Sequence, residues 1–230
     1  MSEEGKDMVL TVLHLTMAIN ATLKHDYFPL GVFQCNCSIL SRDGRAVVID
    51  PGDEFEKILA LLETSGLTVE QILLTHAHID HVGAVAQMKS HFGVTVAMHP
   101  EDQPTYDMLP QQAQWTGVPQ PAPFAIERHL STRETIDCLG REMRVLFTPG
   151  HSPGSVSFYL PEENKVIAGD ALFRRSIGRT DLPGGDHALL LRSIKKQLLS
   201  LPPTTEVFPG HGDPTTIGEE IRSNPFLQER

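Results

Sequence analysis

The sequence predicts an α/β fold, and three observations support this prediction. Short apolar runs typical of buried strands alternate with segments of helical periodicity, and the two halves of the chain share this rhythm. Several apolar runs end in glycine, proline, histidine or aspartate, as strands do where they enter loops. No repeat, low-complexity run or linker divides the 230 residues, so we expect a single domain over residues 1–230.

The first predicted elements are two strands and a helix. Phe33 to Leu40 and Ala46 to Ile49 read as paired strands around the turn Arg42-Asp43-Gly44. A helix is predicted to begin at Asp53, because Glu56 three residues later completes a variant of the capping box. Apolar residues then recur at helical spacing, which predicts that this helix covers a sheet.

Further elements follow along the chain. A second helix is predicted from near Val82 to Gly93, and a short strand from Val94 to Met98. Residues Pro100 to Phe124 hold six prolines and the only tryptophan, with a short helix near Glu101 to Leu109. This segment is either a lid or substrate wall, or a covering insertion, and the sequence leaves both open. A last long helix is predicted over His187 to Leu201.

Composition excludes several classes of function. The formal net charge of −10 opposes binding to phosphate backbones, so no nucleic-acid partner is expected. No apolar stretch approaches the roughly 20 residues that span a bilayer, and the acidic start is unlike a secretory signal. Residues 1–8 are expected to be a frayed tail. The three cysteines, Cys35, Cys37 and Cys138, suggest buried or idle thiols in a reducing cytoplasm, where we place the protein.

The segment behind the apolar run Ile72 to Leu74 contains four good metal ligands within six residues: His76, His78, Asp80 and His81. In an extended chain residues two apart face the same side, so His76 and His78 can hold one cation together. On a helix the same two side chains would diverge by about 200°. Asp80 and His81 then point toward a second cation.

Three other predicted strands also end in ligands. Val145 to Thr148 leads to His151, Val166 to Ala168 leads to Asp170, and Glu206 to Phe208 leads to His211. Each alone is typical of a turn or cap, but together with the first motif they predict a metal site. The remaining histidines lack companion spacing and are interpreted as structural or surface residues: His14, His25, His91, His99, His129 and His187.

From about Phe33 to the end, the order of these ligands resembles that of the metallo-β-lactamase superfamily. The resemblance implies a four-layer αββα sandwich with metals at one edge. It implies a first metal on His76, His78 and His151, a second on Asp80, His81 and His211, and Asp170 as the bridge. Asp50 is either an acidic residue behind the ligands or a turn cap.

Within that superfamily, three segments resemble the small glyoxalase II-like hydrolases: Gly169 to Phe173, Ser176 to Asp186 and Thr215 to Glu219. The resemblance implies hydrolysis of an S-(hydroxyacyl)glutathione such as S-lactoylglutathione by a metal-bound hydroxide, with Asp80 orienting the hydroxide if only one metal is bound. One or two divalent ions are expected, zinc before iron or manganese.

Longer family members carry a C-terminal helical region that helps to bind glutathione, and its contacts cannot be transferred to this chain. A substrate carboxylate could be bound through bidentate hydrogen bonds by one of three arginines: Arg174, Arg175 or Arg179. The expected partner is a small-molecule glutathione thioester. No association with a membrane is expected, and the chain is expected to be a monomer or a homodimer.

The leading alternative is a persulfide dioxygenase of the same superfamily. Such an enzyme would use His76, His151 and Asp170 as a facial triad around one Fe(II) and oxidise glutathione persulfide. An RNA-processing nuclease is disfavoured by the acidic charge, and a β-lactamase would normally be exported. A noncatalytic scaffold on this fold should have lost ligands, whereas all seven are present.

Overall fold

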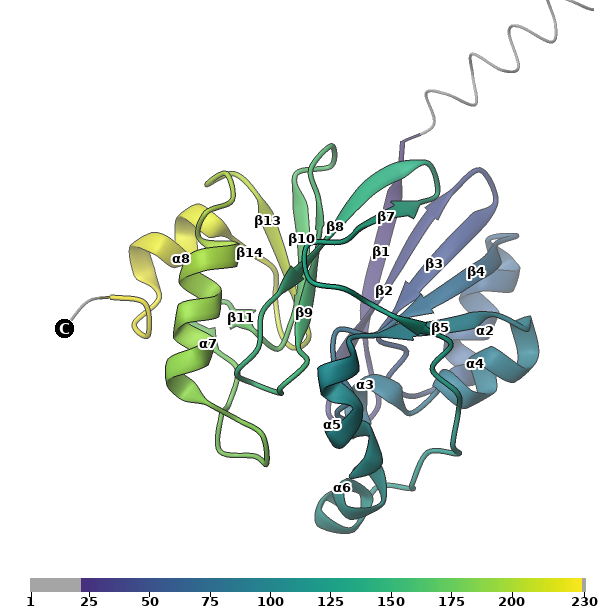
Figure 1. Ribbon diagram of the computed structural model, residues 1–230. Coiled ribbons are helices and arrows are strands. Elements are labelled where there is room, and N and C mark those ends of the chain that lie inside the picture. The colour runs from purple at the N-terminus through teal and green to yellow at the C-terminus, as the bar shows by residue number, and fades with distance from the viewer. Residues whose placement is uncertain (1–21, 229–230) are drawn as a thin grey trace, which may run out of the picture.

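Two β-sheets lie face to face, and helices cover the outer side of each sheet (Figure 1). The computed structural model describes residues 22–228, so the expected frayed tail over residues 1–8 and His14 lie outside the described residues. The predicted αββα sandwich is confirmed.

Among the described residues each large sheet has six strands. The first has the order β1-β2-β3-β4-β5-β6, antiparallel from β1 to β3 and parallel from β3 to β6. Its strands are β1 (Lys24–Leu30), β2 (Cys35–Arg42), β3 (Arg45–Ile49), β4 (Thr68–Leu73), β5 (Thr95–Met98) and β6 (Arg128–His129).

The second sheet has the order β14-β13-β10-β9-β8-β7, in which only β10 and β13 are parallel among the described strands. A two-stranded hairpin, β11 with β12, follows β10. These strands are β7 (Thr135–Cys138), β8 (Arg141–Phe147), β9 (Val156–Leu160), β10 (Lys165–Gly169), β11 (Leu172–Phe173), β12 (Ser176–Ile177), β13 (Glu206–Pro209) and β14 (Thr215–Thr216).

The helices fall into three groups (Figure 1): α2 and α4 beside the first sheet, α7 and α8 beside the second, and α3, α5 and α6 at one end of the sandwich. Their bounds are α2 (Phe55–Thr64), α3 (Ile79–Val82), α4 (Val85–Phe92), the 3-10 turn η1 (Pro100–Asp102), α5 (Gln103–Asp107), α6 (Leu109–Thr116), α7 (His187–Ser193), the π-turn η2 (Ile194–Leu198) and α8 (Ile217–Ser223). No helix among residues 22–228 is long and apolar enough to cross a membrane.

Strand alternation divides the core into three layers. In β3, Val48 packs toward α2 and α4, whereas Val47 and Ile49 pack between the sheets. In β10, Ile167 faces the space between the sheets, and Val166 packs toward α7 and η2. Successive side chains point to opposite faces of a strand, so strands that are covered on both sides must be apolar throughout. The short apolar runs of the sequence are therefore strands buried on both faces.

The predicted start of the first helix is wrong. α2 begins at Phe55, and Glu54 before it is left-handed (φ 50°) with no side-chain cap. The Glu54 carboxylate instead accepts a hydrogen bond from the Gly31 backbone at 2.9 Å, and Asp53 accepts one from Glu54 N at 2.7 Å. Glu54 thus ties the loop between β1 and β2 to the start of α2, and Glu56 completes no capping box.

Other boundaries also differ from the prediction. The second predicted helix is two helices, of which α3 begins at Ile79, three residues before the predicted start. The first predicted strand begins at Cys35 rather than Phe33, because Gly31 and Gln34 have positive φ and form a turn. The edge strands β1, β6 and β7 were not predicted. β1 (Lys24–Leu30) is only partly buried and lacks the continuous apolar run that marks the central strands.

The stability of the fold should depend on pH through His25 on β1. Burial, followed by the charge of Lys165, lowers the pKa of His25 from 6.5 to about 4. Between pH 6.5 and 4 the unfolded chain then binds more protons than the folded chain, so the free energy of unfolding falls as the pH drops. We expect the fall in the free energy of unfolding to be about 3 kcal/mol smaller in His25→Gln than in the parent protein.

Urea unfolding at pH 7 and pH 4, with chelator present throughout, measures this difference. The matched control is His129→Gln, because His129 is exposed and should leave the pH dependence of the parent protein unchanged. An equal pH dependence in the parent protein and in His25→Gln would contradict the prediction.

Candidate metal centre

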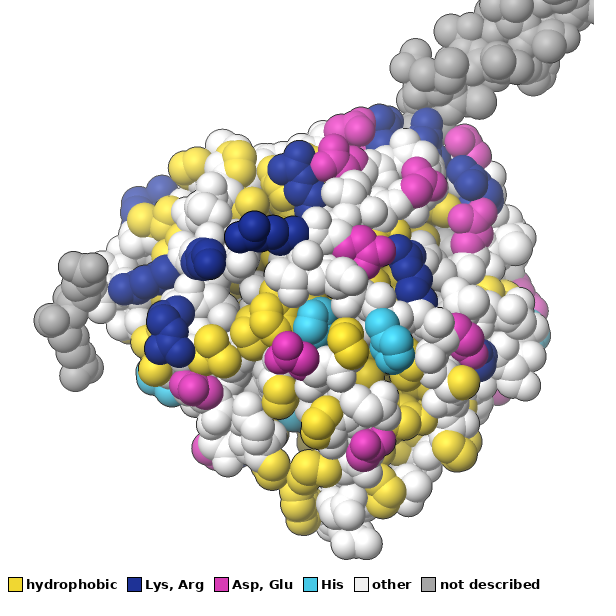
Figure 2. Space-filling view, in the orientation of Figure 1, with side chains coloured by type: hydrophobic (Ala, Val, Ile, Leu, Met, Phe, Trp, Pro, Cys, Tyr) yellow, Lys and Arg dark blue, Asp and Glu magenta, His cyan; other side chains and the backbone are white. Residues whose placement is uncertain are grey.

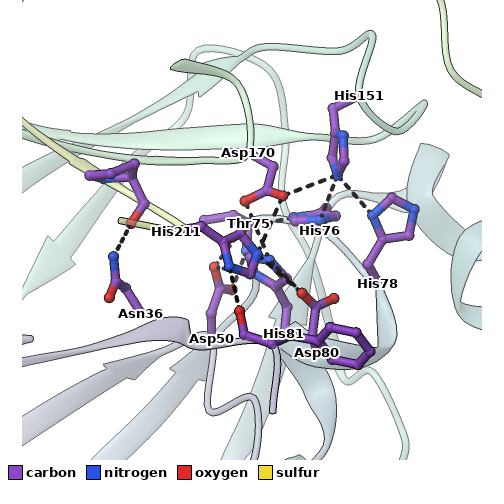
Figure 3. A network of polar contacts seen from close by, with 12 residues as sticks. Asn36, Asp50, Thr75, His76, His78, Asp80, His81, His151, Asp170 and His211 are labelled. Carbon is purple, nitrogen blue, oxygen red and sulfur yellow. Dashed lines mark hydrogen bonds and ion pairs between the residues drawn. The ribbon is translucent and has the colours of Figure 1, made fainter. Parts of the chain in front are cut away.

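All seven residues predicted as ligands meet at the edge where the strands of both sheets end (Figure 3). His76 and His78 lie in the loop after β4, and Asp80 and His81 lie on α3. The remaining three follow strands of the second sheet: His151 after β8, Asp170 after β10 and His211 after β13. Residues separated by as many as 135 positions therefore surround one point.

Three histidines form the first group. His78 Nδ1 lies 2.8 Å from His151 Nε2, and His151 Nε2 lies 3.2 Å from His76 Nε2. One ligand atom from each lies within 4.8 Å of the others, which suits a single metal ion. His76 and His78 converge even though α3 begins directly after them, as their spacing in an extended loop predicts.

The second group joins α3 to the loop after β13. His211 Nε2 lies 3.1 Å from Asp80 Oδ2, and His81 Nε2 lies 4.0 Å from the same oxygen. Asp170 faces both groups, because its Oδ2 lies 3.4 Å from His151 Nε2 and its Oδ1 lies 3.4 Å from His81 Nε2. This placement is the one that a bridging carboxylate needs, and the metal-binding role of the seven residues stays a prediction.

Neighbouring groups orient the histidine rings. Nδ1 of His151 lies 2.8 Å from the Arg179 carbonyl, and Nδ1 of His211 lies 3.0 Å from the Phe33 carbonyl. Each Nδ1 can donate to its carbonyl, which leaves the Nε2 lone pair facing the site.

Asp50 and Thr75 orient two further rings. His81 Nδ1 lies 3.0 Å from Asp50 Oδ2, and His76 Nδ1 lies 3.0 Å from Thr75 Oγ1. Asp50 also accepts hydrogen bonds from the backbone and hydroxyl of Thr75, at 2.8 and 2.6 Å. Of the two roles considered for Asp50, the structure supports the acidic residue behind the ligands, since its carboxylate bonds to His81 and to Thr75 in the loop after β4.

Two buried polar atoms of the site have no hydrogen-bond partner, His81 Nε2 and Asp170 Oδ1. Unpaired buried polar atoms are costly, and here they face each other across 3.4 Å among nitrogen and oxygen donors. A divalent cation would satisfy both atoms. The residues present therefore fit a divalent metal ion, in agreement with the chemistry of the donor set.

Burial and neighbouring charges shift the pKa of several side chains in the site. Burial and the nearby His81 hold the pKa of His76 well below its usual range, and burial with the nearby His151 lowers that of His78 to about 3. Burial opposes ionisation of Asp170, but His81 and the other imidazoles outweigh it and lower the Asp170 pKa.

Despite burial, Cys35 and the neighbouring carboxylates raise the pKa of His81, and a hydrogen bond to Asp80 raises the pKa of His211. Metal ligation needs neutral imidazoles and ionised carboxylates, so His81 and His211 would release protons when a metal binds.

Cys35 lies next to this site. Its sulfur is grouped with a ring nitrogen of His81 and one of His211, all within 4.8 Å of one another. Burial raises the pKa of the Cys35 thiol to about 12, so it stays protonated in the absence of metal. The three cysteines are free and buried, as predicted.

A cavity of about 570 Å³ opens above the predicted ligands. Residues of α5, α6 and the turn between them form one wall, including Met108, Gln112 and Trp115, and Phe173 and Ile177 lie on the opposite side. Residues 118–122 line a neighbouring cavity of about 390 Å³. Parts of segment 100–124 therefore line both cavities beside the predicted ligands, and the role of this segment as a substrate wall stays a prediction.

The three candidate arginines differ in their positions. Arg179 lines the large cavity and pairs with Asp181 through two hydrogen bonds of 2.8 Å. Arg174 lies 3.4 Å from Asp213, and Arg175 lies 3.6 Å from Glu219, and neither lines the described cavities. Of the three arginines, Arg179 alone therefore lines the cavity above the predicted ligands.

Several residues that support the site were not found from the sequence. Thr75 contacts the ring of His76, and three further residues bond to loops that carry predicted ligands: Asn36, Asp102 and Gln112. Asn36 Nδ2, for example, donates to the carbonyls of Pro209 and Gly212 on either side of His211. Thr75 adjoins the histidine motif, but the other three are isolated polar residues without a motif, so no local signal marks them.

The model of the metallo-beta-lactamase superfamily matches residues 30–211. A protein of Haemophilus influenzae named hydroxyacylglutathione hydrolase GloC is 40% identical over 208 residues, covering 89% of this chain and 98% of its own length.

Two solved structures share the architecture. The structure titled TTHA1623 in a di-iron-bound form is 48% identical, with a TM-score of 0.81, and covers 88% of this chain and 100% of its own. The structure titled BLEG-1 B3 metallo-beta-lactamase is 41% identical, with a TM-score of 0.85, and covers 90% and 100%.

Proposed function

This chain belongs to the metallo-beta-lactamase superfamily, and from that premise we propose that it is a metal-dependent hydrolase of S-(hydroxyacyl)glutathione thioesters such as S-lactoylglutathione. The observation that carries the proposal is the convergence of seven histidine and aspartate side chains beneath a partly apolar cavity. The name of the Haemophilus influenzae relative supports the substrate class.

We assign the predicted ligands to two metal positions. His76, His78 and His151 would hold the first ion, Asp80, His81 and His211 the second, and Asp170 would bridge the two. Divalent ions bound here would lower the pKa of water toward neutrality and polarise a thioester carbonyl. Imidazole and carboxylate accept zinc, iron and manganese, and the di-iron form of a similar structure supports iron alongside zinc.

The protein side chains can orient a water molecule, and they line the cavity that would hold the substrate. Asp80 lines both cavities, and its pKa lies below the usual range because His81 and a hydrogen bond from His211 outweigh its burial. Asp80 therefore stays ionised at neutral pH, and if only the first metal position is filled it can hold a nucleophilic water through a hydrogen bond. Apolar side chains such as Phe173 and Ile177 line the cavity in which the thioester carbonyl would lie.

We further propose that Arg179 binds a carboxylate of the substrate. Replacing Arg179 with Ala should raise KM for S-lactoylglutathione about tenfold and leave kcat nearly unchanged, because a charge-assisted hydrogen bond to bound substrate is lost. The carbonyl that orients His151 belongs to the backbone and stays in place. Steady-state kinetics measures the effect, and an equal rise of KM in Arg174→Ala would contradict the assignment.

The persulfide dioxygenase is the second candidate. It is favoured by one observation, since His76 and Asp170 both lie within 3.4 Å of His151 Nε2 and these three residues could form a triad around one iron. The remaining four residues would then have no metal to bind. We favour the hydrolase because three of those four, Asp80, His81 and His211, also form a group beside Asp170.

One experiment separates the candidate activities. Protein loaded in turn with zinc, iron or manganese is assayed for S-lactoylglutathione hydrolysis, for oxygen uptake with glutathione persulfide, and for opening of a β-lactam. The β-lactam assay is included because a similar structure is titled a metallo-beta-lactamase. We expect thioester hydrolysis that chelator abolishes. Oxygen uptake without thioester hydrolysis would reverse the order of the two candidates.

A further inference from the structure

Two buried polar side chains outside the predicted ligand set connect the cavity wall to the metal loops. Asp102 on η1 has no exposed surface, and Gln112 on α6 is 7% exposed. Both belong to the segment 100–116, in whose region Figure 2 shows hydrophobic and uncharged side chains and few charged ones. A buried carboxylate or amide is costly unless hydrogen bonds satisfy it, so the partners of these two residues indicate their role.

The carboxylate of Asp102 holds two loops that carry predicted ligands. Its Oδ2 accepts a hydrogen bond of 2.5 Å from the backbone N–H of Ala77, the residue between His76 and His78. Its Oδ1 accepts one of 2.9 Å from the backbone N–H of Gly154, three residues after His151. One side chain thus connects the two loops that supply the first histidine group.

Gln112 completes the hydrogen bonding of the first loop. Its Oε1 accepts from the backbone N–H of Ile79 at 2.9 Å, and its Nε2 donates to the carbonyls of Ala77 at 3.4 Å and Thr105 at 2.8 Å. Both backbone groups of Ala77 therefore bond to side chains of segment 100–116. Buried backbone groups need such partners, and here no sheet or helix supplies them.

We propose that Asp102 and Gln112 are positioning residues, which hold His76, His78 and His151 in the geometry that binds metal. Gln112 also lines the substrate cavity, as do Thr105, Met108 and Trp115. The segment that forms the substrate wall is therefore the segment that orients the metal loops. This inference rests on the proposed function only in taking the three histidines as metal-binding residues.

Gln112→Glu and Asp102→Asn test the proposal with little change of volume. The first places an oxygen beside the carbonyls of Ala77 and Thr105, and the second places an amide or a neutral oxygen against backbone N–H groups. We expect each variant to bind Zn²⁺ 10–100-fold more weakly, the range typical of lost partners behind metal ligands. Competition with a chromogenic chelator measures the affinity, and far-ultraviolet circular dichroism checks the fold.

The matched controls are Gln114→Glu and Asp107→Asn, which make the same chemical changes at exposed positions on α6 and α5. Both should keep the Zn²⁺ affinity of the parent protein. With saturating zinc, kcat of Gln112→Glu should recover toward the parent value, which general damage to the fold would not allow. Unchanged Zn²⁺ affinity in a folded Gln112→Glu variant, or equal weakening in Gln114→Glu, would overturn the proposal.

The affinity measurement keeps this inference separate from the proposed function. If the parent protein binds zinc but hydrolyses no thioester, the proposed substrate is wrong, while the comparison of Zn²⁺ affinities still decides the role of Asp102 and Gln112. If Asp102→Asn does not fold, Gln112→Glu alone decides, because the Asp102 contacts remain intact in that variant.

Discussion

Replacing Asp170 with Asn should lower thioester hydrolysis about 10³-fold and remove at least one metal ion per chain. Asp170 lies between the two groups of predicted ligands, 3.4 Å from His151 and 3.4 Å from His81. An amide carries no charge to attract a second cation, and it turns donor hydrogens toward ring nitrogens. Losing one metal removes several kcal/mol of transition-state stabilisation, and each 1.4 kcal/mol is a factor of ten in rate.

The measurements are metal content by elemental analysis and hydrolysis of S-lactoylglutathione at fixed metal. Asp213→Asn is the matched control, because Asp213 is exposed and pairs with Arg174 away from the described cavities. If Asp170→Asn retained full metal content, the bridging role assigned to Asp170 would be wrong. If Asp170→Asn lost activity but retained both metals, Asp170 would act in the reaction and would not be needed to bind metal.

The second large effect is expected at Gly210, the residue before His211. A Cβ on Gly210 would lie 2.1 Å from Asp170 Oδ1 and 2.8 Å from His81 Cε1. The backbone cannot move away freely, because Gly210 N donates to Gly169 O at 2.8 Å and Gly210 O accepts from Asn36 N at 2.7 Å. Gly210→Ala should therefore displace the Asp170 carboxylate and weaken the second metal position.

We expect Gly210→Ala to lower hydrolysis about 10²-fold, because displacements near 1 Å have effects of this size. Overpacking should also destabilise the fold by about 1–3 kcal/mol. Gly212→Ala is the control: nothing lies within 4 Å of its added Cβ, and its φ of +74° costs only about 1–2 kcal/mol. Metal content and thermal unfolding distinguish the two variants, and retention of two metals and parental activity by Gly210→Ala would refute the prediction.

The sequence predicted the central strands well, and the candidate ligands that it singled out lie together in the structure, because both follow local rules. Strands buried on both faces, such as β3 and β10, need continuous apolar runs, and ligands such as Asp170 and His211 follow directly after strands. The same local rules failed where tertiary contacts outweighed them. Glu54 bonds to Gly31 on another segment, so the helix expected at Asp53 begins two residues later without a side-chain cap.

The sequence by itself determined the family, the layered α/β fold and the residues that could form a metal centre, because periodicity and motif order are properties of neighbouring residues. Only the tertiary structure decided how that centre is held. The carboxylate of Asp102 meets backbone groups 25 residues before it and 52 residues after it, and Gln112 meets a loop 33 residues before it. Hydrogen bonds between distant segments depend on how the chain packs, and a lone buried polar residue carries no local pattern that predicts its partners.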